Sequence, residues 1–218
     1  MNKPLLSRES VLEKALAIAD AEGLAAVTIR RIAGEFGVTP MAMYWHFANK
    51  EELLAALGQR LWNSVEVDPE ASLRELLTIL VEALRAHPAI AGLADTQMLS
   101  SEGGLAVTER ALELLAGSGF SVAEASAIAR NAMQLAATMV IGEPGADVGI
   151  SAAEREALVA MKCQRIGELS QQKYPRIVAA ASALTEVDDV EEYYRVSIDL
   201  FVAGVETMAR SRSLPGFS

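Results

Sequence analysis

The chain has 218 residues, of which 51% are apolar and 22% charged, and its formal net charge is −10. This length exceeds one small domain, and the composition suits a globular protein with a helical core. Its uncharged stretches are too short and too often interrupted by polar residues to span a bilayer, and its N-terminus carries Lys3, Arg8 and Glu9 instead of a signal-peptide hydrophobic run. We therefore expect a cytoplasmic protein without a membrane partner.

The first predicted helix begins after Ser7, whose hydroxyl can cap it, and ends at Gly23. We expect it to brace the two helices that follow by packing one apolar face against them. That face is formed by Val11, Leu12, Ala15, Leu16 and Ala19.

Residues 28–47 are predicted to form two helices separated by a turn of about three residues. Thr28 can accept hydrogen bonds from the first free amides of a helix that Gly37 ends, because glycine adopts the left-handed conformation cheaply. The apolar face of this helix is formed by Ile29, Ile32, Ala33 and Phe36. Thr39 and Pro40, a hydroxyl cap and a proline at the first helical position, begin the next helix. The pattern is a helix-turn-helix.

The second of these helices has an outward face with no evident partner in the core. Met43 and Phe47, four residues apart, can face back toward the preceding helix. The side chains left to point outward are Met41, Ala42, Trp45 and His46. A core helix with stray exposed groups is one explanation. The position after a capped helix and a short turn favours a recognition helix, which presents its N-terminal residues to base edges in the major groove.

A further helix is predicted to begin after Asn49, with Glu52 three residues later in a pattern close to a capping box. Its apolar positions follow at helical spacing and are Leu53, Leu54, Leu57 and Leu61. Lys50 is unusual in the first turn, because the helix dipole favours anions there unless an external anion such as a phosphate joins the lysine. A solvated lysine paired with Glu51 or Glu52 is the alternative.

Residues 7–62 resemble the tetracycline repressor (TetR) family of bacterial transcriptional regulators. The matching segments are residues 24–37, 44–47 and 49–54, and the run Tyr44, Trp45, His46 followed by Asn49 and Lys50 looks especially like the tetracycline repressors. Beyond residue 62 the similarity is looser and rests on residues 174–176 and 200–205.

The resemblance implies an all-α fold with an N-terminal three-helix helix-turn-helix DNA-binding domain, residues 1–62, and a C-terminal helical-bundle domain for ligand binding and dimerisation, residues 63–218. It favours a phosphate contact for Lys50. It also implies a guanine contact for Arg30, which stands where tetracycline repressors place an arginine, with Arg31 as the solvent or phosphate alternative. The expected DNA contacts are Thr28, Arg30, Thr39, Pro40, Met41, Ala42, Tyr44, Trp45, His46 and Lys50.

The negative charge is unevenly distributed along the chain. Residues 1–62 hold seven Lys/Arg and seven Asp/Glu, whereas residues 63–218 hold 12 and 22. The acidity of the second part would keep it away from a duplex, while basic groups near the helix-turn-helix supply phosphate contacts. A neutral DNA-binding head predicts modest non-specific affinity.

The part after residue 63 is predicted to be helical throughout, since it shows no strand-like alternation, phosphate-binding glycine loop or internal repeat. The first three predicted helices are 73–86, which His87 and Pro88 stop, 105–116, which Gly117 and Gly119 end, and 122–141, which the capping box of Ser121 and Glu124 opens. Ser151 and Glu154 open a fourth helix in the same way. A short helix is predicted at Tyr174 and Pro175, and a last one runs from Asp188 and Asp189 to about Arg210.

Helix 122–141 and the last helix are too apolar to be ordinary surface helices, so both must be covered on two sides. One monomer core could cover both faces. Given the resemblance, we prefer a homodimer in which these two helices pair with their copies across a two-fold axis.

The body is expected to bind a bulky hydrophobic effector in an apolar, adaptable cavity, with simple core packing as the alternative for each residue. The candidate lining is Trp62, Met98, Leu99, Leu112, Met133 and Met139. Tetracycline repressors hold a magnesium–tetracycline chelate with histidines near the end of helix 4 and in helix 6, but residues 61–66 and 89–97 contain none. His87, before Pro88 at a helix end, is not favoured as a metal ligand, so no metal and no cofactor are expected.

An enzyme is not favoured, because the chain has no H-E-x-x-H helix, no Cys/His metal spacing and no Gly-x-Ser-x-Gly elbow. The lone Cys163 excludes an internal disulfide framework and is interpreted as a small buried residue, in preference to a redox sensor. We predict a dimeric repressor that leaves an inverted-repeat DNA operator when a small hydrophobic ligand shifts its heads through the helix ending at Trp62. A DNA-binding dimer controlled by a protein partner, without a small-molecule effector, is the alternative.

Overall fold

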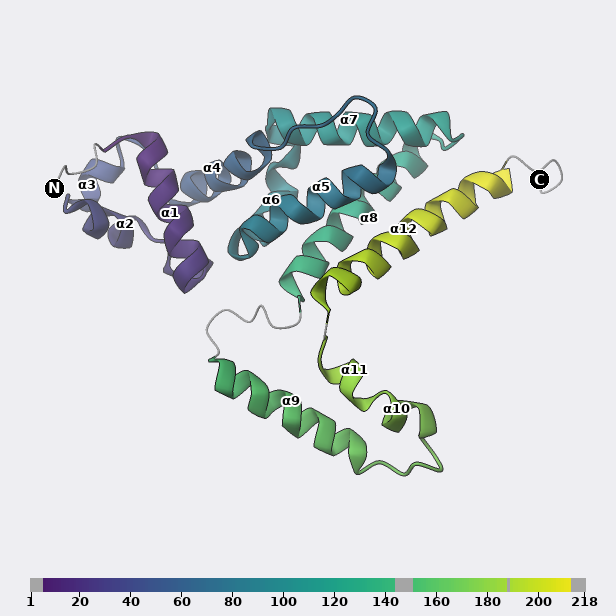
Figure 1. Cartoon of the computed structure of the whole chain (residues 1–218). Helices are drawn as coiled ribbons and strands as arrows, with labels where there is room; N and C mark the ends of the chain where they lie inside the picture. The colour runs from purple at the N-terminus through teal and green to yellow at the C-terminus, as the bar shows by residue number, and fades with distance from the viewer. Residues whose placement is uncertain (1–5, 144–150, 188, 213–218) are drawn as a thin grey trace.

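The computed structural model describes residues 6–143, 151–187 and 189–212. Within these ranges the chain forms helices joined by turns and no strand, which confirms the all-α prediction (Figure 1). The helices are α1 (Arg8–Glu22), α2 (Ile29–Phe36), α3 (Pro40–Met43), α4 (Lys50–Asn63), α5 (Leu73–Ala86), α6 (Ala91–Gln97), α7 (Glu102–Gly117), α8 (Val122–Ile141), α9 (Ala152–Gly167), α10 (Pro175–Ala179), α11 (Ala181–Thr185) and α12 (Val190–Arg212). Short 3-10 turns occupy Leu24–Ala26, Pro88–Ile90 and Met98–Ser100.

Helices α1 to α3 form a head at one end of the molecule (Figure 1). The side chain of Ser7 caps α1 as predicted, and Asn49 caps α4 by accepting a hydrogen bond of 2.7 Å from the amide of Glu52. Helix α4 then runs out of the head, and its last turn buries Leu61 and Trp62. One continuous apolar cluster extends from α1 through α4 to α12, so the head shares its core with the rest of the chain. The domain boundary at residue 62, which falls inside α4, stays a prediction.

The body consists of α5 to α8 with α12 laid across them (Figure 1). Helices α5 and α8 have the predicted bounds, whereas α12 continues two residues further, to Arg212, and α6 was not predicted. Helix α7 starts at Glu102, three residues before its predicted start. The prediction failed because Gly103 and Gly104 weaken helix propensity. Both glycines are needed, since a Cβ at Gly103 would overlap the carbonyl oxygen of Trp62 and a Cβ at Gly104 would overlap that of Met98.

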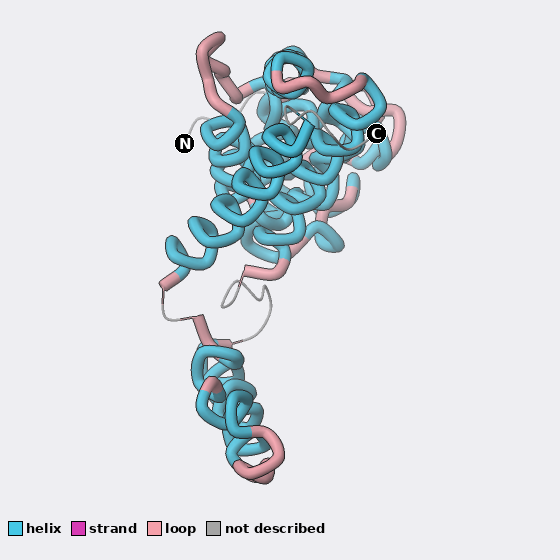
Figure 2. The backbone as a smooth tube through the Cα atoms, turned by 90° about the vertical axis from the view of Figure 1, so that its right-hand side faces the viewer, coloured by secondary structure: helices cyan, strands magenta, loops and turns pink. Residues whose placement is uncertain are grey.

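Helices α9 to α11 form an arm that stands apart from the body in two perpendicular views (Figures 1 and 2). Ser151 and Glu154 make the predicted capping box at the start of α9, which packs against α10 and α11. None of the arm's described side chains is fully buried. The Sγ atom of Cys163 lies 2.7 Å from Oγ1 of Thr185, so this half-buried thiol joins α9 to α11 and the prediction of a buried core cysteine is wrong.

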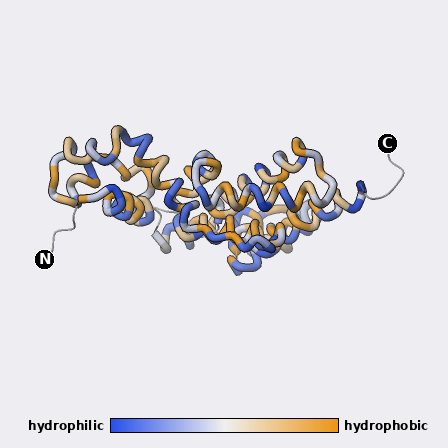
Figure 3. The backbone as a smooth tube through the Cα atoms, turned by 90° about the horizontal axis from the view of Figure 1, so that it is seen from above, coloured by the Kyte–Doolittle hydropathy of each residue, from blue (hydrophilic) through white to orange (hydrophobic). Residues whose placement is uncertain are grey.

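Seen from above, the head and the C-terminal end of α12 lie at opposite ends of the molecule, and apolar and polar residues are mixed along the tube (Figure 3). Helix α8 buries one face, and two of its apolar residues, Val122 and Ile141, are exposed. Among the described residues no helix alone has the length and apolar content to cross a membrane, and one sharply bent pair, Leu73–Ala86 with Pro88–Ala94, meets these criteria jointly.

Candidate DNA-recognition surface and body cavity

The turn between α2 and α3 has the predicted geometry at its start. The Oγ1 atom of Thr28 accepts a hydrogen bond of 3.1 Å from the amide of Arg31, and Gly37 ends α2 in the left-handed conformation, with φ 60° and ψ 38°. Pro40 takes the first position of α3, but the Thr39 side chain makes no capping hydrogen bond, so the predicted hydroxyl cap is wrong. The amide of Ala42 instead donates to the carbonyl oxygen of Thr39 at 3.0 Å.

Helix α3 is shorter than predicted: it ends at Met43, whereas the sequence predicted a helix that continues to about Phe47. Met43 and Phe47 are buried as expected, and the side chains of Tyr44, Trp45 and His46 lie in the turn that follows the helix. Met41, Tyr44 and Trp45 are exposed, and Trp45 is 88% accessible. The outward placement holds less well for Ala42 and His46, which are half-buried.

The two arginines of α2 differ in their partners. Arg31 forms ion pairs with Glu22, at 2.8 Å, and with Glu35, and these carboxylates raise the pKa of its guanidinium. Arg30 is exposed and makes no ion pair with any side chain in the described part of the chain. Arg31 is therefore held within the head, and Arg30 is the arginine of α2 that can reach a ligand.

Lys50, the first residue of α4, was predicted either to contact a phosphate or to pair with a neighbouring glutamate. The glutamate pairing is not seen: within the described residues Lys50 forms no ion pair with Glu51 or Glu52, and the phosphate contact stays a prediction. The carboxylate of Glu52 instead contacts Arg8 at 3.0 Å and accepts a hydrogen bond of 2.8 Å from the amide of Ala48. The ammonium group thus stands at a helix N-terminus, where the dipole opposes it, without a compensating carboxylate.

A cavity of about 510 Å³ lies in the body between α5, α7 and α8. Four of the six residues predicted to bind a ligand line it: Met98, Leu99, Leu112 and Met133. Leucines of α5 also line it, together with the polar side chains of Thr108, Glu109, Ser126 and Arg130. The cavity is thus mainly apolar with a few polar groups, as in sites for small hydrophobic molecules.

Trp62 and Met139, the other two predicted ligand residues, do not line this cavity. Trp62 is fully buried, and its indole Nε1 donates a hydrogen bond of 2.8 Å to the carbonyl oxygen of Ala94 in α6. Met139 is buried near the C-terminal end of α8. Both residues pack in the core, which was the alternative interpretation of an apolar residue in this sequence.

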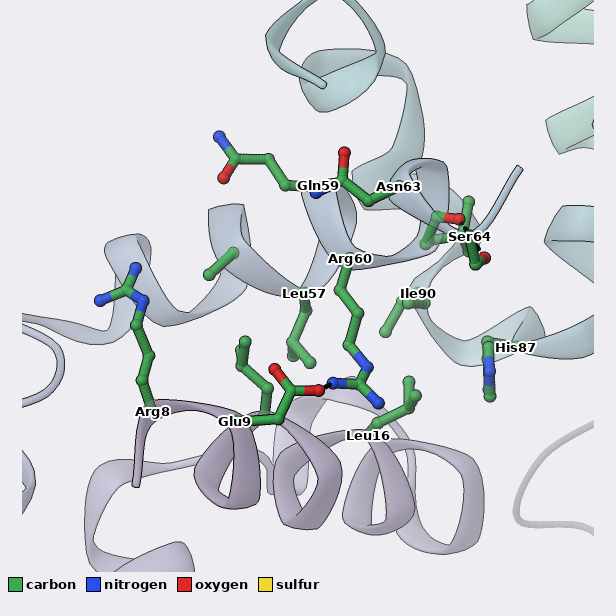
Figure 4. A pocket seen from close by; sticks show the side chains of 13 residues that line it. Arg8, Glu9, Leu16, Leu57, Gln59, Arg60, Asn63, Ser64, His87 and Ile90 are labelled. Carbon is green, nitrogen blue, oxygen red and sulfur yellow. Dashed lines mark hydrogen bonds and ion pairs between the residues drawn. The ribbon is translucent and has the colours of Figure 1, made fainter. Parts of the chain in front are cut away.

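A second recess, of about 700 Å³, separates α1 from α4 and the Pro88–Ile90 turn (Figure 4). Arg60 reaches across it from α4 to Glu9 of α1 (Figure 4). Nδ1 of His87, at the edge of the recess, lies 2.9 Å from the carboxylate of Asp20. Its apolar floor, which includes Leu57, is already buried by packing between the helices. These contacts make the recess a junction between head and body.

Two protein families match the chain. Residues 11–57 match the family described as bacterial regulatory proteins, tetR family, and residues 68–209 match the family described as tetracyclin repressor-like, C-terminal domain. The chain belongs to the tetR family. This assignment confirms the resemblance carried by the helix-turn-helix, and it extends the match over the body, where the sequence similarity had looked looser.

The tetR-family relatives match over part of their length. An HTH-type transcriptional regulator of Saccharopolyspora erythraea is 27% identical over 56% of this chain and 54% of its own. The class C tetracycline repressor of Escherichia coli is 44% identical over 28% of this chain and 27% of its own. The aligned stretches thus cover about half of the first relative and about a quarter of the second, and the higher identity falls on the shorter stretch.

Solved tetR-family structures share the fold over most of the chain. The Streptomyces coelicolor protein ActR, in complex with actinorhodin, has a TM-score of 0.75 at 23% identity, over 94% of this chain and 99% of its own. BioQ with its double-stranded DNA operator has a TM-score of 0.56 at 26% identity, over 82% of this chain and 99% of its own.

Sequence reasoning missed two parts of the sites in this tetR-family chain. The α5 leucines that line the cavity, among them Leu73, Leu77 and Leu80, have a helical spacing that predicted a buried face without showing what it faces. Arg8, which contacts the segment after α3, carried no signal because its partners are 38 and 44 residues away in sequence. Within the described residues no group of three or more His, Cys, Asp or Glu side chains could hold a metal ion.

Proposed function

We propose that the chain is a homodimeric DNA-binding repressor that releases an inverted-repeat operator when a small hydrophobic ligand binds in its body. One observation carries the DNA-binding part. The exposed side chains of Met41, Tyr44 and Trp45 stand on the same head as Arg30 and Lys50, two cations with no ion-pair partner among the described residues. Such cations supply the phosphate attraction on which DNA affinity largely depends. The BioQ structure with its operator supports this reading of the shared fold.

Each candidate residue has a role that follows from its chemistry. Arg30 is the fork-shaped donor suited to guanine O6 and N7, and Met41 and Ala42 suit the methyl group of thymine. Lys50 neutralises a phosphate. Thr28, Tyr44 and His46 contribute a hydroxyl, a phenol and an imidazole. These groups contact the DNA phosphate backbone and so fix the register of the head on the duplex. The remaining members of the surface are Thr39, Pro40 and Trp45.

The homodimer is supported by two helix faces that the monomer leaves uncovered. On α8 the exposed stripe consists of Ala123, Ala127, Asn131, Gln134, Thr138 and Ile141. On α12 it consists of Val196, Leu200, Ala203, Gly204, Thr207 and Met208, and Leu200 is 71% accessible. Stripes of small and apolar residues at helical spacing let helices approach closely, so a second copy could cover both. A two-fold dimer places its recognition segments about 34 Å apart, which calls for an inverted repeat.

The ligand site is the body cavity, with Met98, Leu99, Leu112 and Met133 in its wall. Its volume of about 510 Å³ suits a drug-sized molecule, and its lining favours a largely hydrophobic one. ActR, which shares this fold, is known in complex with actinorhodin and with (S)-DNPA. The histidines that hold a metal chelate in tetracycline repressors are missing here, so binding needs no metal.

Helix α4 connects the two sites. Its first residue is Lys50, and its last turn contacts α6 through the Trp62 hydrogen bond and α7 through Gly103. A ligand can shift the heads only through a difference in affinity between two arrangements, about 5.5 kcal/mol for a shift from 1:99 to 99:1. The ligand must therefore bind more tightly to the arrangement that does not fit the operator.

The proposal is tested on the full chain. Sedimentation gives the oligomeric state, and repeated selection from random-sequence duplexes recovers the preferred DNA. We expect a dimer and an inverted repeat; a monomer that selects asymmetric sites would contradict the proposal. Hydrophobic compounds are then screened by thermal shift with a chelator present, and hits are titrated against the protein–duplex complex. A hit that stabilises the protein without releasing DNA would show that the cavity is not the regulatory input.

A protein partner that controls DNA binding is the second candidate. The body cavity favours control by a small molecule over control by a protein partner. We also propose that the chain has no enzymatic role and acts in the cytoplasm.

A further inference from the structure

The recognition segment is too short to hold its own shape. Helix α3 has four residues, Pro40–Met43, and three exposed or half-buried candidate contacts follow it in a turn. Isolated helices shorter than about 12 residues are marginal in water, because the first turn fixes the dihedral angles of several residues and gains only one hydrogen bond. The only buried anchor at the end of this turn is Phe47 in the described structure. Contacts from outside the segment must therefore fix where its side chains point.

Arg8 in the first turn of α1 makes such contacts. Its Nη1 donates a hydrogen bond of 2.6 Å to the carbonyl oxygen of His46 and one of 3.0 Å to Oε1 of Glu52. Its guanidinium carbon lies 4.2 Å from the centroid of the Phe47 ring, within cation–π range. One side chain thus touches the end of the recognition segment and the start of α4 together.

Glu52 completes the arrangement on the other side. Its Oε2 accepts a hydrogen bond of 2.8 Å from the amide of Ala48, and its own amide donates to Asn49 at 2.7 Å. The Ala48 amide and then the Arg8 guanidinium lower the pKa of this carboxyl, so it is ionised at neutral pH. Residues 46–52 are in this way tied to α1 at their backbone, at a ring and at a carboxylate.

We propose that Arg8 is a positioning residue for DNA recognition: it holds residues 44–50 against α1, and so presents Tyr44, Trp45 and Lys50 to the duplex. The hydrogen bonds of its Nη1 are directed into the head, to the His46 carbonyl oxygen and Glu52, and this favours a positioning role over a phosphate contact. This inference rests on the proposed function. It adds that the DNA-recognition surface depends on Arg8, the first residue of α1, although α1 is not one of the two helices of the helix-turn-helix.

The first test needs no DNA. Backbone hydrogen exchange of residues 44–49 is compared between the wild type, Arg8→Gln and the control Arg74→Gln, which removes an exposed arginine that pairs with Asp199 in the body. Arg8→Gln should exchange faster in this segment, and Arg74→Gln should match the wild type. Unchanged exchange in Arg8→Gln would overturn the inference. Glu52→Gln, which weakens the same contacts from α4, should give the same increase and serves if Arg8→Gln does not fold.

The second test uses the inverted-repeat duplex that the wild type selects. Arg8→Gln should bind it about tenfold more weakly, the value of one charge-assisted hydrogen bond, with an unchanged dependence on salt. A phosphate contact would instead lower the salt slope by about one unit and leave hydrogen exchange unaltered. Unchanged affinity would also overturn the positioning role. If the wild type itself selects no duplex, the proposed function fails, and the positioning role for DNA fails with it, whatever the exchange data show.

Discussion

The indole Nε1 of Trp62 donates a 2.8 Å hydrogen bond to the carbonyl oxygen of Ala94, and this fully buried contact joins the last turn of α4 to α6. Trp62 therefore joins α4, the helix that leads to the head, to the body, and it lies outside the cavity wall. Its place in the sequence suggested a ligand contact. The structure makes it a candidate for transmitting the effect of a ligand instead.

Trp62→Phe should separate ligand binding from DNA release. The ring remains apolar, but the Ala94 carbonyl loses a buried donor, at a cost of about 1–3 kcal/mol in unfolding free energy. Urea unfolding measures that loss. Ligand affinity should change little, because the cavity wall is intact, while more ligand is needed to release DNA. A large fall in ligand affinity itself would place Trp62 in the binding site after all.

Ala129→Phe should block the cavity. Ala129 lines the cavity and is half-buried, so a phenyl ring at this position would take up part of the cavity. We expect ligand affinity to fall by at least about tenfold, since the ring takes space that the ligand needs. Calorimetric titration measures this, and Ala106→Phe, on an exposed position of α7 outside the lining, is the matched control. Equal affinities in the two variants would place the ligand elsewhere.

Lys50→Ala should weaken binding to all DNA sequences alike. Loss of one phosphate contact lowers the slope of log affinity against log salt by about one unit. The slope is measured by fluorescence anisotropy over a range of salt concentrations. Lys173→Ala removes the same charge from the arm, where the ammonium stacks on Tyr174, and should leave the slope unchanged. A wild-type slope in Lys50→Ala would identify Lys50 as a solvated lysine.

Arg30→Ala should relax the preference for one guanine in each half-site by about 1–3 kcal/mol, while other positions keep theirs. Arg31→Ala, at the adjacent residue, is the control, and we expect it to affect the stability of the head and not base preference. Its ion pairs with Glu22 and Glu35 are lost, so the head loses internal contacts while base preference is retained. Competition among single-base variants of the selected duplex distinguishes the two. A uniform loss across all variants would make Arg30 a phosphate contact.

Glu124→Gln should remove part of the acid sensitivity of folding. Arg212, and then the Ser121 side chain and amide, lower the pKa of Glu124 from 4.5 to about 2. An unfolded chain binds this proton first as the pH falls, so the contribution is present above pH 4.5 and is lost towards pH 2. The difference in denaturation midpoint between wild type and Glu124→Gln should shrink over that range.

The sequence predicted those elements whose signals are local. Capping residues and helical spacing located α5 and α8 to the residue, and Gly37 ended α2 as its conformational freedom requires. The errors arose where a distant contact decides the structure. Gly103 opposes helix formation by propensity, yet it lies inside α7, where the carbonyl oxygen of Trp62 leaves no room for a side chain.

The same limit applies to the candidate sites. Arg30 and Arg31 are adjacent and chemically identical, and only the positions of Glu22 and Glu35 show which of them is free. Apolar spacing could not tell a cavity wall from a packed core, so Met133 and Met139 looked equivalent in the sequence. The first lines the cavity and the second does not. Which partner a buried side chain meets depends on tertiary packing that helical periodicity does not record.

The close approach of Gly103 to the Trp62 carbonyl has a mechanical consequence. It fixes the C-terminal end of α4, so any swing of this helix has its pivot there and its largest amplitude at the other end. Lys50 lies twelve residues away, about 18 Å along a helix axis at 1.5 Å per residue. A rotation of about 10° at the pivot would carry Lys50 through about 3 Å, roughly the length of a hydrogen bond to a phosphate. Through a helix of this length, a displacement in the body that is shorter than a side chain can break a contact between Lys50 and the DNA.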